Sequence, residues 1–269
     1  MKKKIINILM VIFILVAVGC GGYLAYYYYT SHKSESDISD LRSRISYNDT
    51  VSDKETDDTG KSGPEMVDVD GVKIQKKFEK LYSSNHDFVG WITIKDTNID
   101  YPVMYTPNDN ERGEHYIHLD YEGNYSAAGL PFIDQNCDLI LPTDNVIIYG
   151  HNMNSGKMFH DLLKYDDEDF YEKHKSFTFD TIYGDGTYEV VAVFYAQILP
   201  DSSNDFKYYE FVNAGSREEF DSYVDNIKRM SVIDTGVDVK YGDKLITLST
   251  CAYHVKDGRF AVIAKKLDE

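Results

Sequence analysis

The pattern of hydrophobic and polar residues divides the chain into three stretches. An uncharged, largely apolar run extends from Ile5 to Tyr29, a polar stretch follows to residue 70, and short apolar runs then recur to the end. About 20 apolar residues in a helix suffice to cross a bilayer. The first stretch therefore predicts a transmembrane helix, and the last predicts a folded domain of residues 71–269.

The residues that flank the apolar run indicate its orientation. Lysines occupy positions 2–4 before it, and four tyrosines end it at positions 26–29. Positive residues favour the cytoplasmic side, and aromatic rings favour the membrane interface. We therefore expect residues 1–4 to be a cytoplasmic stub, residues 5–29 to be an anchor and the rest to be extracellular. A cleaved signal peptide and lipidation at Cys20 are the alternatives, but the run is long and ends without a small-residue cleavage site.

Residues 30–70 are rich in serine, threonine and acidic residues, and apolar residues are scattered among them. Such a composition cannot bury enough apolar surface to offset the conformational entropy that folding removes. The segment therefore predicts a disordered acidic tether that holds the following domain away from the membrane.

The domain of residues 71–269 shows mainly strand patterns. Short runs rich in valine, isoleucine, phenylalanine and tyrosine alternate with irregular spacers, which favours a barrel or sandwich over β-α-β units. The eight predicted strands are residues 88–94, 99–104, 130–133, 146–149, 176–179, 188–195, 245–250 and 260–264. The predicted fold class is therefore mainly β.

Three segments of this domain have helical spacing instead. Apolar residues recur at helical intervals over residues 72–82, and a short helix is predicted over 158–164. The clearest pattern covers residues 216–230, where apolar side chains share one stripe and two glutamates occupy the first turn. This helix lies within a long connection, residues 196–243. Long insertions of this kind commonly bind a ligand or form a lid.

The charge and the cysteine count exclude several classes of protein. The chain has 28 Lys and Arg against 45 Asp and Glu, a net charge of −17, so nucleic acid is not an expected partner. The three cysteines, at positions 20, 137 and 251, are too few for a disulfide framework. No Cys-x-x-Cys pair is present, which argues against a structural zinc site.

A thiol and a guanidinium are predicted to lie close together. Cys251 ends one apolar strand and Arg259 begins the next, with the turn signal Asp257-Gly258 between them. Paired strands lie about 5 Å apart, so the two side chains share one end of the hairpin. A guanidinium favours the thiolate and can hold an oxyanion. The alternative is that Cys251 is a small buried hydrophobic residue.

A nucleophilic thiol needs a base, and the chain has eight histidines. His151 follows a buried strand and leads a polar loop, a common place for catalytic residues. His254 is closer to Cys251 in sequence, but its loop does not fix its direction. His115 and His118 are three residues apart in an irregular stretch, which is more typical of surface residues than of a metal site.

These segments resemble the signatures of a known family. Residues 247–251, Thr-Leu-Ser-Thr-Cys, followed by Gly258 and Arg259, are similar to the active-site signature of sortases. Residues 149–153, Tyr-Gly-His-Asn-Met, are similar to their histidine segment. Further segments that resemble class B sortases are residues 91–94, 101–103, 170–175 and 228–232. The resemblance extends over roughly residues 70–267.

The resemblance implies a fold, an activity and partners. Sortases fold as an eight-stranded β-barrel, and class B members carry a helix in the connection before the cysteine strand. They are membrane-anchored cysteine transpeptidases on the extracellular face of Gram-positive bacteria. They cleave a sorting motif near the C-terminus of a secreted protein, after its threonine. A thioester forms, and an amine of a peptidoglycan precursor then resolves it.

The resemblance also implies a role for individual residues. Cys251 would be the nucleophile, His151 the general acid and base, and Arg259 the stabiliser of the tetrahedral oxyanion. Substrate-binding residues would lie on the floor and one wall of a groove: Ser249, Thr250, Phe206, Tyr208 and Tyr209.

The chain departs from the class B pattern in two places. Ala252 stands where some members have an acidic residue after the cysteine. Residues 108–115 are longer and differently composed than the family segment that often supplies a substrate-contacting asparagine. Asn108 and Asn110 are the candidates for that role.

No metal or cofactor is expected, because class B sortases generally need none. Asp201, Asp205 and Glu210 are interpreted as solvated acids rather than as a calcium site. Two alternatives to a transpeptidase remain open. One is a sortase-like surface barrel that binds peptides without turnover, and the other is a hydrolytic cysteine protease, in which water takes the place of the amine.

Overall fold

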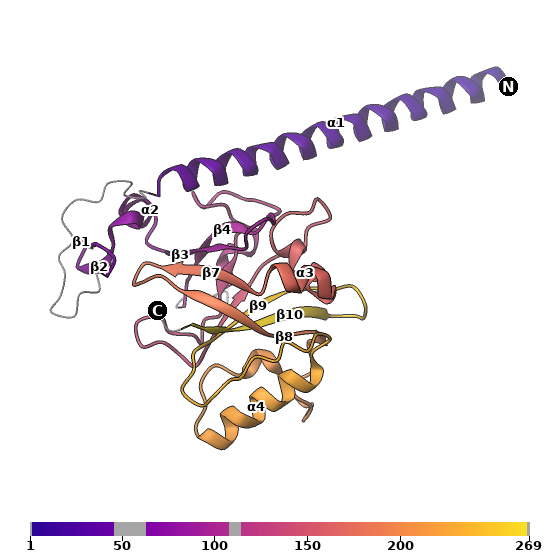
Figure 1. The fold of residues 1–269 in the computed structure, drawn as a ribbon. Helices are drawn as coiled ribbons and strands as arrows, with labels where there is room; N and C mark the ends of the chain where they lie inside the picture. Colours follow the sequence, from indigo (N-terminus) through magenta and orange to yellow (C-terminus); the bar gives the residue numbers. More distant parts are fainter. Residues whose placement is uncertain (1, 46–62, 108–113, 268–269) are drawn as a thin grey trace. The chain divides into compact units, whose positions relative to one another are not determined.

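The computed structural model describes residues 2–45, 63–107 and 114–267, and the chain forms two compact units, Met1–Arg42 and Ser43–Glu269. The first unit is built from a single helix, α1 (Lys2–Ser43) (Figure 1). Among the described residues, the structure contains no helix that is both long enough and apolar enough to cross a membrane.

Part of the range predicted as a disordered tether is ordered. Helix α1 extends into it as far as Ser43, and β1 (Met66–Val69) pairs with β2 (Val72–Gln75) in an antiparallel hairpin. Asp70 and Gly71 form the turn with φ angles of 51° and 84°, and Asp-Gly is a strong signal for such a two-residue turn. The prediction missed this hairpin because only half of its residues are apolar. Residues 46–62 of the predicted tether lie outside the described residues.

The predicted helix of residues 72–82 is correct only in its second half. Strand β2 occupies residues 72–75, and the 3₁₀ helix η1 (Lys76–Phe78) and helix α2 (Glu79–Ser84) follow. Val72 and Ile74 are two residues apart, a spacing that places both on one face of a strand but not on one face of a helix. The hairpin partner β1 decides between the two.

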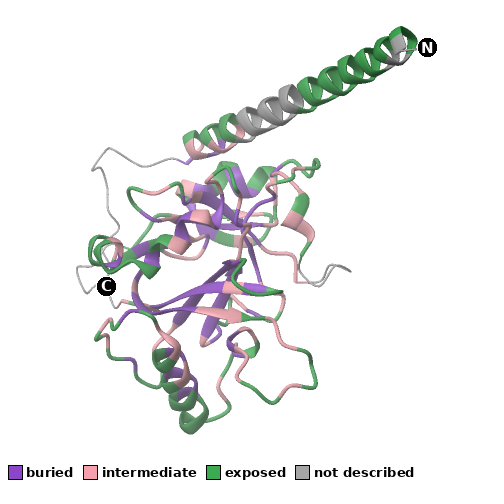
Figure 2. Cartoon of the chain, turned by 90° about the vertical axis from the view of Figure 1, so that its right-hand side faces the viewer, coloured by how far each residue is buried: buried purple, intermediate pink, exposed green. Residues whose placement is uncertain are grey.

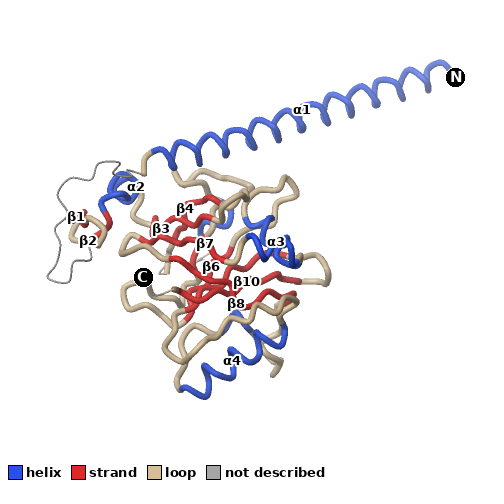
Figure 3. The backbone as a smooth tube through the Cα atoms, viewed as in Figure 1, coloured by secondary structure: helices blue, strands red, loops and turns tan. Residues whose placement is uncertain are grey.

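The eight predicted strands are all present and close into a barrel in the order β10-β8-β7-β3-β4-β5-β6-β9. The strands are β3 (Phe88–Thr93), β4 (Asp100–Met104), β5 (Phe132–Ile133), β6 (Asn145–Tyr149), β7 (Ser176–Thr181), β8 (Thr187–Gln197), β9 (Leu245–Cys251) and β10 (Gly258–Lys266). Figure 3 shows them in red, joined by long tan connections. The predicted eight-stranded barrel is confirmed.

The pairing of the barrel strands is mixed. Most pairs are antiparallel, but β4 pairs with β5 and β6 pairs with β9 in parallel. Strands β6 and β9 are almost entirely buried, as expected for parallel strands covered on both faces. Because parallel strands point the same way, the residues that follow β6 and β9 emerge at the same edge of the barrel.

The long connection before β9 carries helix α4 (Arg217–Met230), which confirms the helix predicted over residues 216–230. The side chain of Ser216 caps its first turn by accepting a hydrogen bond from the backbone N–H of Glu219 at 3.2 Å. Phe220, Tyr223 and Ile227 are buried in a cluster that includes residues of β8. Figure 2 shows this buried face of α4 in purple and its solvent face in green.

Four shorter helices complete the described part of the fold. The helix predicted over residues 158–164 is a 3₁₀ helix, and the other three were not predicted because each spans only one or two turns. They are η2 (His115–His118), η3 (Phe159–Asp166), α3 (Glu168–Lys173) and η4 (Tyr208–Glu210).

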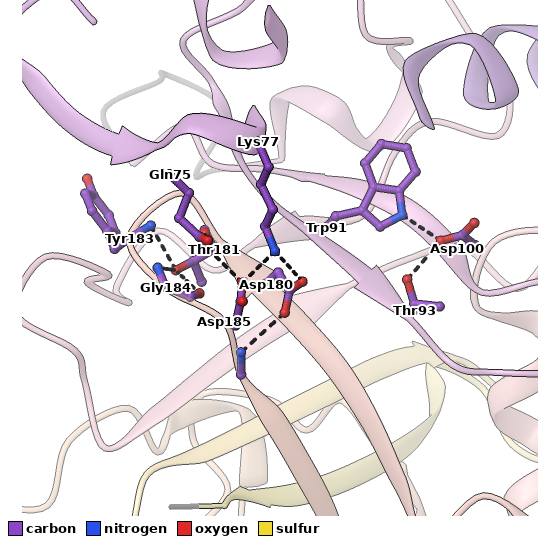
Figure 4. A network of polar contacts seen from close by, with 11 residues as sticks. Gln75, Lys77, Trp91, Thr93, Asp100, Asp180, Thr181, Tyr183, Gly184 and Asp185 are labelled. Atoms are coloured by element: carbon purple, nitrogen blue, oxygen red, sulfur yellow. Dashed lines mark hydrogen bonds and ion pairs between the residues drawn. The ribbon is translucent and has the colours of Figure 1, made fainter. Parts of the chain in front are cut away.

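A polar network fastens the N-terminal hairpin to the turn between β7 and β8 (Figure 4). The side-chain amide of Gln75 donates to the carbonyl of Thr181 at 2.7 Å and to Asp185 at 3.0 Å. The Lys77 ammonium lies 2.7 Å from Asp180 and 2.5 Å from Asp185. These contacts join β2 and the helix that follows it to the barrel.

Candidate active site

Two parallel strands end side by side at one edge of the barrel. In the register of β6 and β9, Tyr149 lies opposite Ser249. His151 and Cys251 each follow these residues by two positions, so the imidazole and the thiol emerge from neighbouring strand ends. Both residues are partly exposed. This arrangement agrees with the prediction that each of them tops a buried strand.

Two hydrogen bonds hold the chain that leaves β6 against the end of β9. The backbone N–H of Gly150 donates to the carbonyl of Ser249 at 3.1 Å, and the Thr250 hydroxyl donates to the carbonyl of Gly150 at 2.7 Å. A Cβ at position 150 would lie 2.7 Å from the ring of Phe159, so only glycine fits there. Gly150 thus lets the chain pass close to Phe159 just before His151.

Arg259 lies directly opposite Cys251 in the antiparallel pair of β9 and β10. The hairpin closes where the backbone N–H of Ala252 donates to the carbonyl of Gly258 at 3.0 Å, with Asp257 at a φ of 54°. One guanidinium nitrogen of Arg259 donates to the carbonyl of Gly258 at 3.0 Å. The predicted placement of thiol and guanidinium on adjacent strand ends is confirmed.

The surroundings of His151 favour a neutral imidazole with a defined tautomer. Its Nε2 lies 2.9 Å from the carbonyl oxygen of Ile117. Because a carbonyl oxygen only accepts hydrogen bonds, Nε2 carries the proton and Nδ1 is left as the proton acceptor. Burial lowers the pKa of His151, and the neighbouring His118 lowers it further, while the bond to Ile117 opposes the shift. The ring of His118 stacks on that of His151, with centroids 5.3 Å apart.

The alternative base, His254, lies in the exposed loop between β9 and β10. Its ring contacts the ring of Tyr195 edge-on, with centroids 4.9 Å apart. Of the two histidines, His151 is the one at the end of a strand that pairs in register with β9.

Three of the predicted substrate contacts are buried. Tyr208, Ser249 and Thr250 expose no more than 2 % of their surface. The hydroxyls of Tyr208 and Ser249 share a hydrogen bond of 2.7 Å, and burial raises the pKa of Tyr208 to about 12. The Tyr208 hydroxyl thus braces Ser249 near the end of β9, and a contact between these three side chains and a substrate stays a prediction.

The other two predicted contacts, Phe206 and Tyr209, are half-buried in the connection before α4. The ring of Phe206 packs near that of Tyr223, with centroids 5.7 Å apart. The Tyr209 hydroxyl accepts a hydrogen bond from the backbone N–H of Leu199 at 2.9 Å. A contact between these two side chains and a substrate stays a prediction.

No role was predicted from the sequence for Asn152 or for His160. In the structure, Asn152 is 9 % exposed, and its amide nitrogen donates to the carbonyl of Cys251 at 2.9 Å. The amide oxygen lies 2.7 Å from Nδ1 of His160. The signal in the sequence that could have indicated a role for Asn152 was its position directly after His151.

Two of the acids considered as calcium ligands have side-chain partners within their own loop. Over residues 2–45, 63–107 and 114–267, the structure contains no group of three or more His, Cys, Asp or Glu side chains arranged to hold a metal ion. Glu210 pairs with Lys207 at 3.0 Å, and Asp205 accepts from Ser203 at 2.9 Å. The predicted contacts Asn108 and Asn110 lie outside the described residues.

Comparisons with known proteins agree with this geometry. Residues 92–267 match the family model described as the sortase domain. Sortase B of Listeria monocytogenes is 36 % identical over 179 residues, which cover 66 % of this chain and 68 % of that protein. Sortase B of Staphylococcus aureus is 32 % identical over 194 residues, which cover 71 % of this chain and 75 % of that protein.

Solved structures are similar over most of the chain. The structure of sortase B from B. anthracis in complex with AAEK1 has a TM-score of 0.71 at 26 % identity, and the match covers 90 % of this chain and all of that one. The Staphylococcus aureus sortase B–substrate complex has a TM-score of 0.64 at 32 % identity and covers 72 % and 86 % of the two chains.

Proposed function

The chain belongs to the sortase family, and from this premise we propose the reaction that its site performs. Its similarity to sortase B proteins makes it a transpeptidase of cell-wall sorting. We propose that it cleaves a C-terminal sorting motif of a secreted protein after threonine and joins the new carboxyl end to an amine of a peptidoglycan precursor. Cys251, His151 and Arg259 are the proposed catalytic residues.

One observation carries this proposal: the barrel register brings three chemically matched side chains to one edge. Arg259 lies opposite Cys251, and His151 follows the strand that runs parallel to that of Cys251. A thiol nucleophile, a neutral imidazole and a fixed cation are the groups that acyl transfer requires.

In the first half of the proposed reaction, Nδ1 of His151 takes the proton of Cys251. The thiolate attacks the threonine carbonyl carbon, and Arg259 stabilises the negative charge on the carbonyl oxygen. The C–N bond then breaks, and His151 returns its proton to the leaving amine. The protein substrate is now attached to Cys251 as a thioester.

In the second half, the neutral amine of the peptidoglycan precursor attacks the thioester. His151 takes a proton from the attacking nitrogen, and the C–S bond breaks as the new amide forms. His151 returns the proton to the Cys251 sulfur, which restores the enzyme. The lowered pKa of His151 suits both halves, because the imidazole must begin each of them neutral, with Nδ1 free to accept a proton.

We further propose that residues 5–29 anchor the enzyme in the cell membrane of a Gram-positive bacterium, with the barrel on the extracellular side. The support is the uncharged apolar run and the lysines before it. Fractionation of cells that produce the chain, followed by protease digestion from outside, tests this placement. Recovery of the chain as a soluble cytoplasmic protein would contradict it.

The test of the activity uses the purified chain and a panel of sorting-motif peptides, with and without triglycine. Triglycine is a suitable acceptor because a sortase B has been solved in complex with a ligand of three glycines. Mass spectrometry should detect the amide product with wild type and with Cys137→Ala, but not with Cys251→Ala. If the peptide is hydrolysed to the same extent with and without triglycine, the chain is a hydrolytic cysteine protease. If the peptide binds but neither the amide nor the hydrolysis product forms, the chain is a barrel that binds peptides without turnover.

A further inference from the structure

The side chain of Asn152 joins the two backbone segments that carry the nucleophile and the base. Its amide nitrogen donates to the carbonyl oxygen of Cys251 at 2.9 Å. Asn152 also directly follows His151 in the chain. Its side chain therefore links the backbone next to His151 to the backbone of Cys251. The residue is 9 % exposed, so solvent does little to replace this bond.

The ring of His160 determines which way the amide of Asn152 faces. Because the amide nitrogen donates to Cys251, the oxygen faces His160, whose Nδ1 lies 2.7 Å away. An amide oxygen only accepts, so Nδ1 of His160 carries the proton and donates it. If this donor were lost, the amide could rotate and turn its oxygen toward the carbonyl of Cys251, where two acceptors would face each other.

The loop between the two histidines closes on itself and brings His160 into place. The backbone N–H of Phe159 donates to the carbonyl of His151 at 2.8 Å, and Asn152 and Met158 form a β-bridge. Met158 has a φ of 55°, a left-handed conformation that is costly for a residue with a side chain. Such a conformation persists only where the surrounding contacts hold it, and here it returns the chain to Asn152.

We propose that Asn152 is a positioning residue for the transpeptidase, and that His160 acts through it by fixing the direction of its amide. The inference rests on the function proposed above. Acyl transfer needs the thiol, the imidazole and the carbonyl carbon aligned, and a misplacement of about 1 Å can cost about a hundredfold in rate. The pair acts on the alignment of Cys251 with His151, so its loss lowers kcat more than it raises KM.

The test compares four variants of the full chain: Asn152→Ala, Asn152→Asp, His160→Ala and His160→Asn. Asn152→Ala should lower kcat about 10- to 100-fold with KM changed less than about twofold. Asn152→Asp should be at least as impaired, because a carboxylate would face the carbonyl of Cys251. His160→Ala should be impaired less, and His160→Asn should recover activity because its amide nitrogen can donate where Nδ1 stood.

Exposed His86, which pairs with Asp70 at 3.0 Å, supplies the matched control His86→Ala. Thermal unfolding is measured for every variant, and kinetics are compared below the lowest melting temperature. The proposal would be overturned if kcat fell only in proportion to the loss of thermal stability. It would also be overturned if His160→Asn had no higher kcat than His160→Ala. Wild-type kcat in Asn152→Ala would overturn it too.

A second measurement separates this proposal from the proposed function. The rate of Cys251 alkylation by iodoacetamide is followed against pH by mass spectrometry, which needs no substrate. Asn152→Ala should alter the pH profile of this rate, because the thiol and the imidazole lose their alignment, and an unchanged profile would refute the positioning role. Absence of wild-type turnover would refute the proposed function alone.

Discussion

Cys137 lies against β6 and Cys251 ends β9, the strand paired with β6, yet the surroundings of the two thiols are opposite. Cys137 is 3 % exposed, its sulfur accepts a hydrogen bond from the backbone N–H of Ile147 at 3.3 Å, and burial raises its pKa to about 12. Cys251 is half-buried at the strand end and lies opposite Arg259. A thiol packed against the middle of this strand pair is therefore closed to solvent, whereas a thiol at its end is accessible and lies beside a cation.

The largest difference in activity should appear when each cysteine is replaced by alanine. Cys251→Ala should lower transpeptidation at least about a thousandfold, because the nucleophile is removed and a positioned thiol has no substitute. Cys137→Ala should retain wild-type activity and lose roughly 1 kcal/mol of stability, since a buried sulfur leaves a small cavity. Product formation and urea unfolding measure the two effects. Comparable activity of both variants would show that Cys251 is not the nucleophile.

Arg259→Lys tests whether the positive charge or the donor geometry of Arg259 matters at Cys251. The substitution keeps the charge but replaces a planar donor fork with a flexible ammonium. If Arg259 holds the oxyanion, kcat should fall on the order of a hundredfold or more, with little change in the alkylation rate of Cys251. A kcat close to that of wild type would leave Arg259 as a charge partner or as a structural residue of the hairpin.

Alkylation should separate the two thiols without any substrate. At pH 8, a thiol with a pKa of about 12 is ionised in only about one molecule in ten thousand, and Cys137 is also closed to solvent. Iodoacetamide should therefore modify Cys251 at least about tenfold faster than Cys137 in the folded chain. Prior unfolding in urea should equalise the two rates. Fast labelling of Cys137 in the folded chain would contradict the closed environment.

The smallest expected effect concerns the ring stacked on the proposed base. His118→Phe keeps an aromatic ring against His151 but removes a group that can carry positive charge. Because His118 contributes to the lowered pKa of His151, the variant should have a His151 pKa slightly higher than that of wild type. An NMR titration of the imidazole measures this shift. A pKa that moved downward would show that the ring acts on His151 chiefly through burial.

The sequence predicted the barrel and the thiol–guanidinium pair because both depend on local patterns. All eight strands are short apolar runs between turn residues, and the pairing of Cys251 with Arg259 follows from one hairpin. Helix α4 could be predicted equally well, because its capping residue Ser216 and its apolar stripe lie together in one short segment of sequence.

The features that the sequence did not predict depend on contacts between distant segments. The hydrogen bond from His151 to Ile117 spans 34 residues, and that from Asn152 to Cys251 spans 99. The hairpin of β1 and β2 was missed because residues 66–70 match a polar segment and residues 72–75 were assigned to a helix, and only their pairing with each other makes both of them strands. Likewise, Tyr208 is buried by packing against residues of β8 and α4, and its hydroxyl finds its partner in Ser249, 41 residues away.

The parallel pairing of β6 and β9 also determines when during folding the enzyme becomes active. The hydrogen bond between Thr250 and Gly150 joins residues 100 apart, and a contact of this separation requires a large loop to close first. Barrels with such non-local pairings fold slowly. Until β9 adds to β6, Cys251 and His151 are not held at neighbouring strand ends, so we expect transpeptidation to return during refolding only after this pairing has formed.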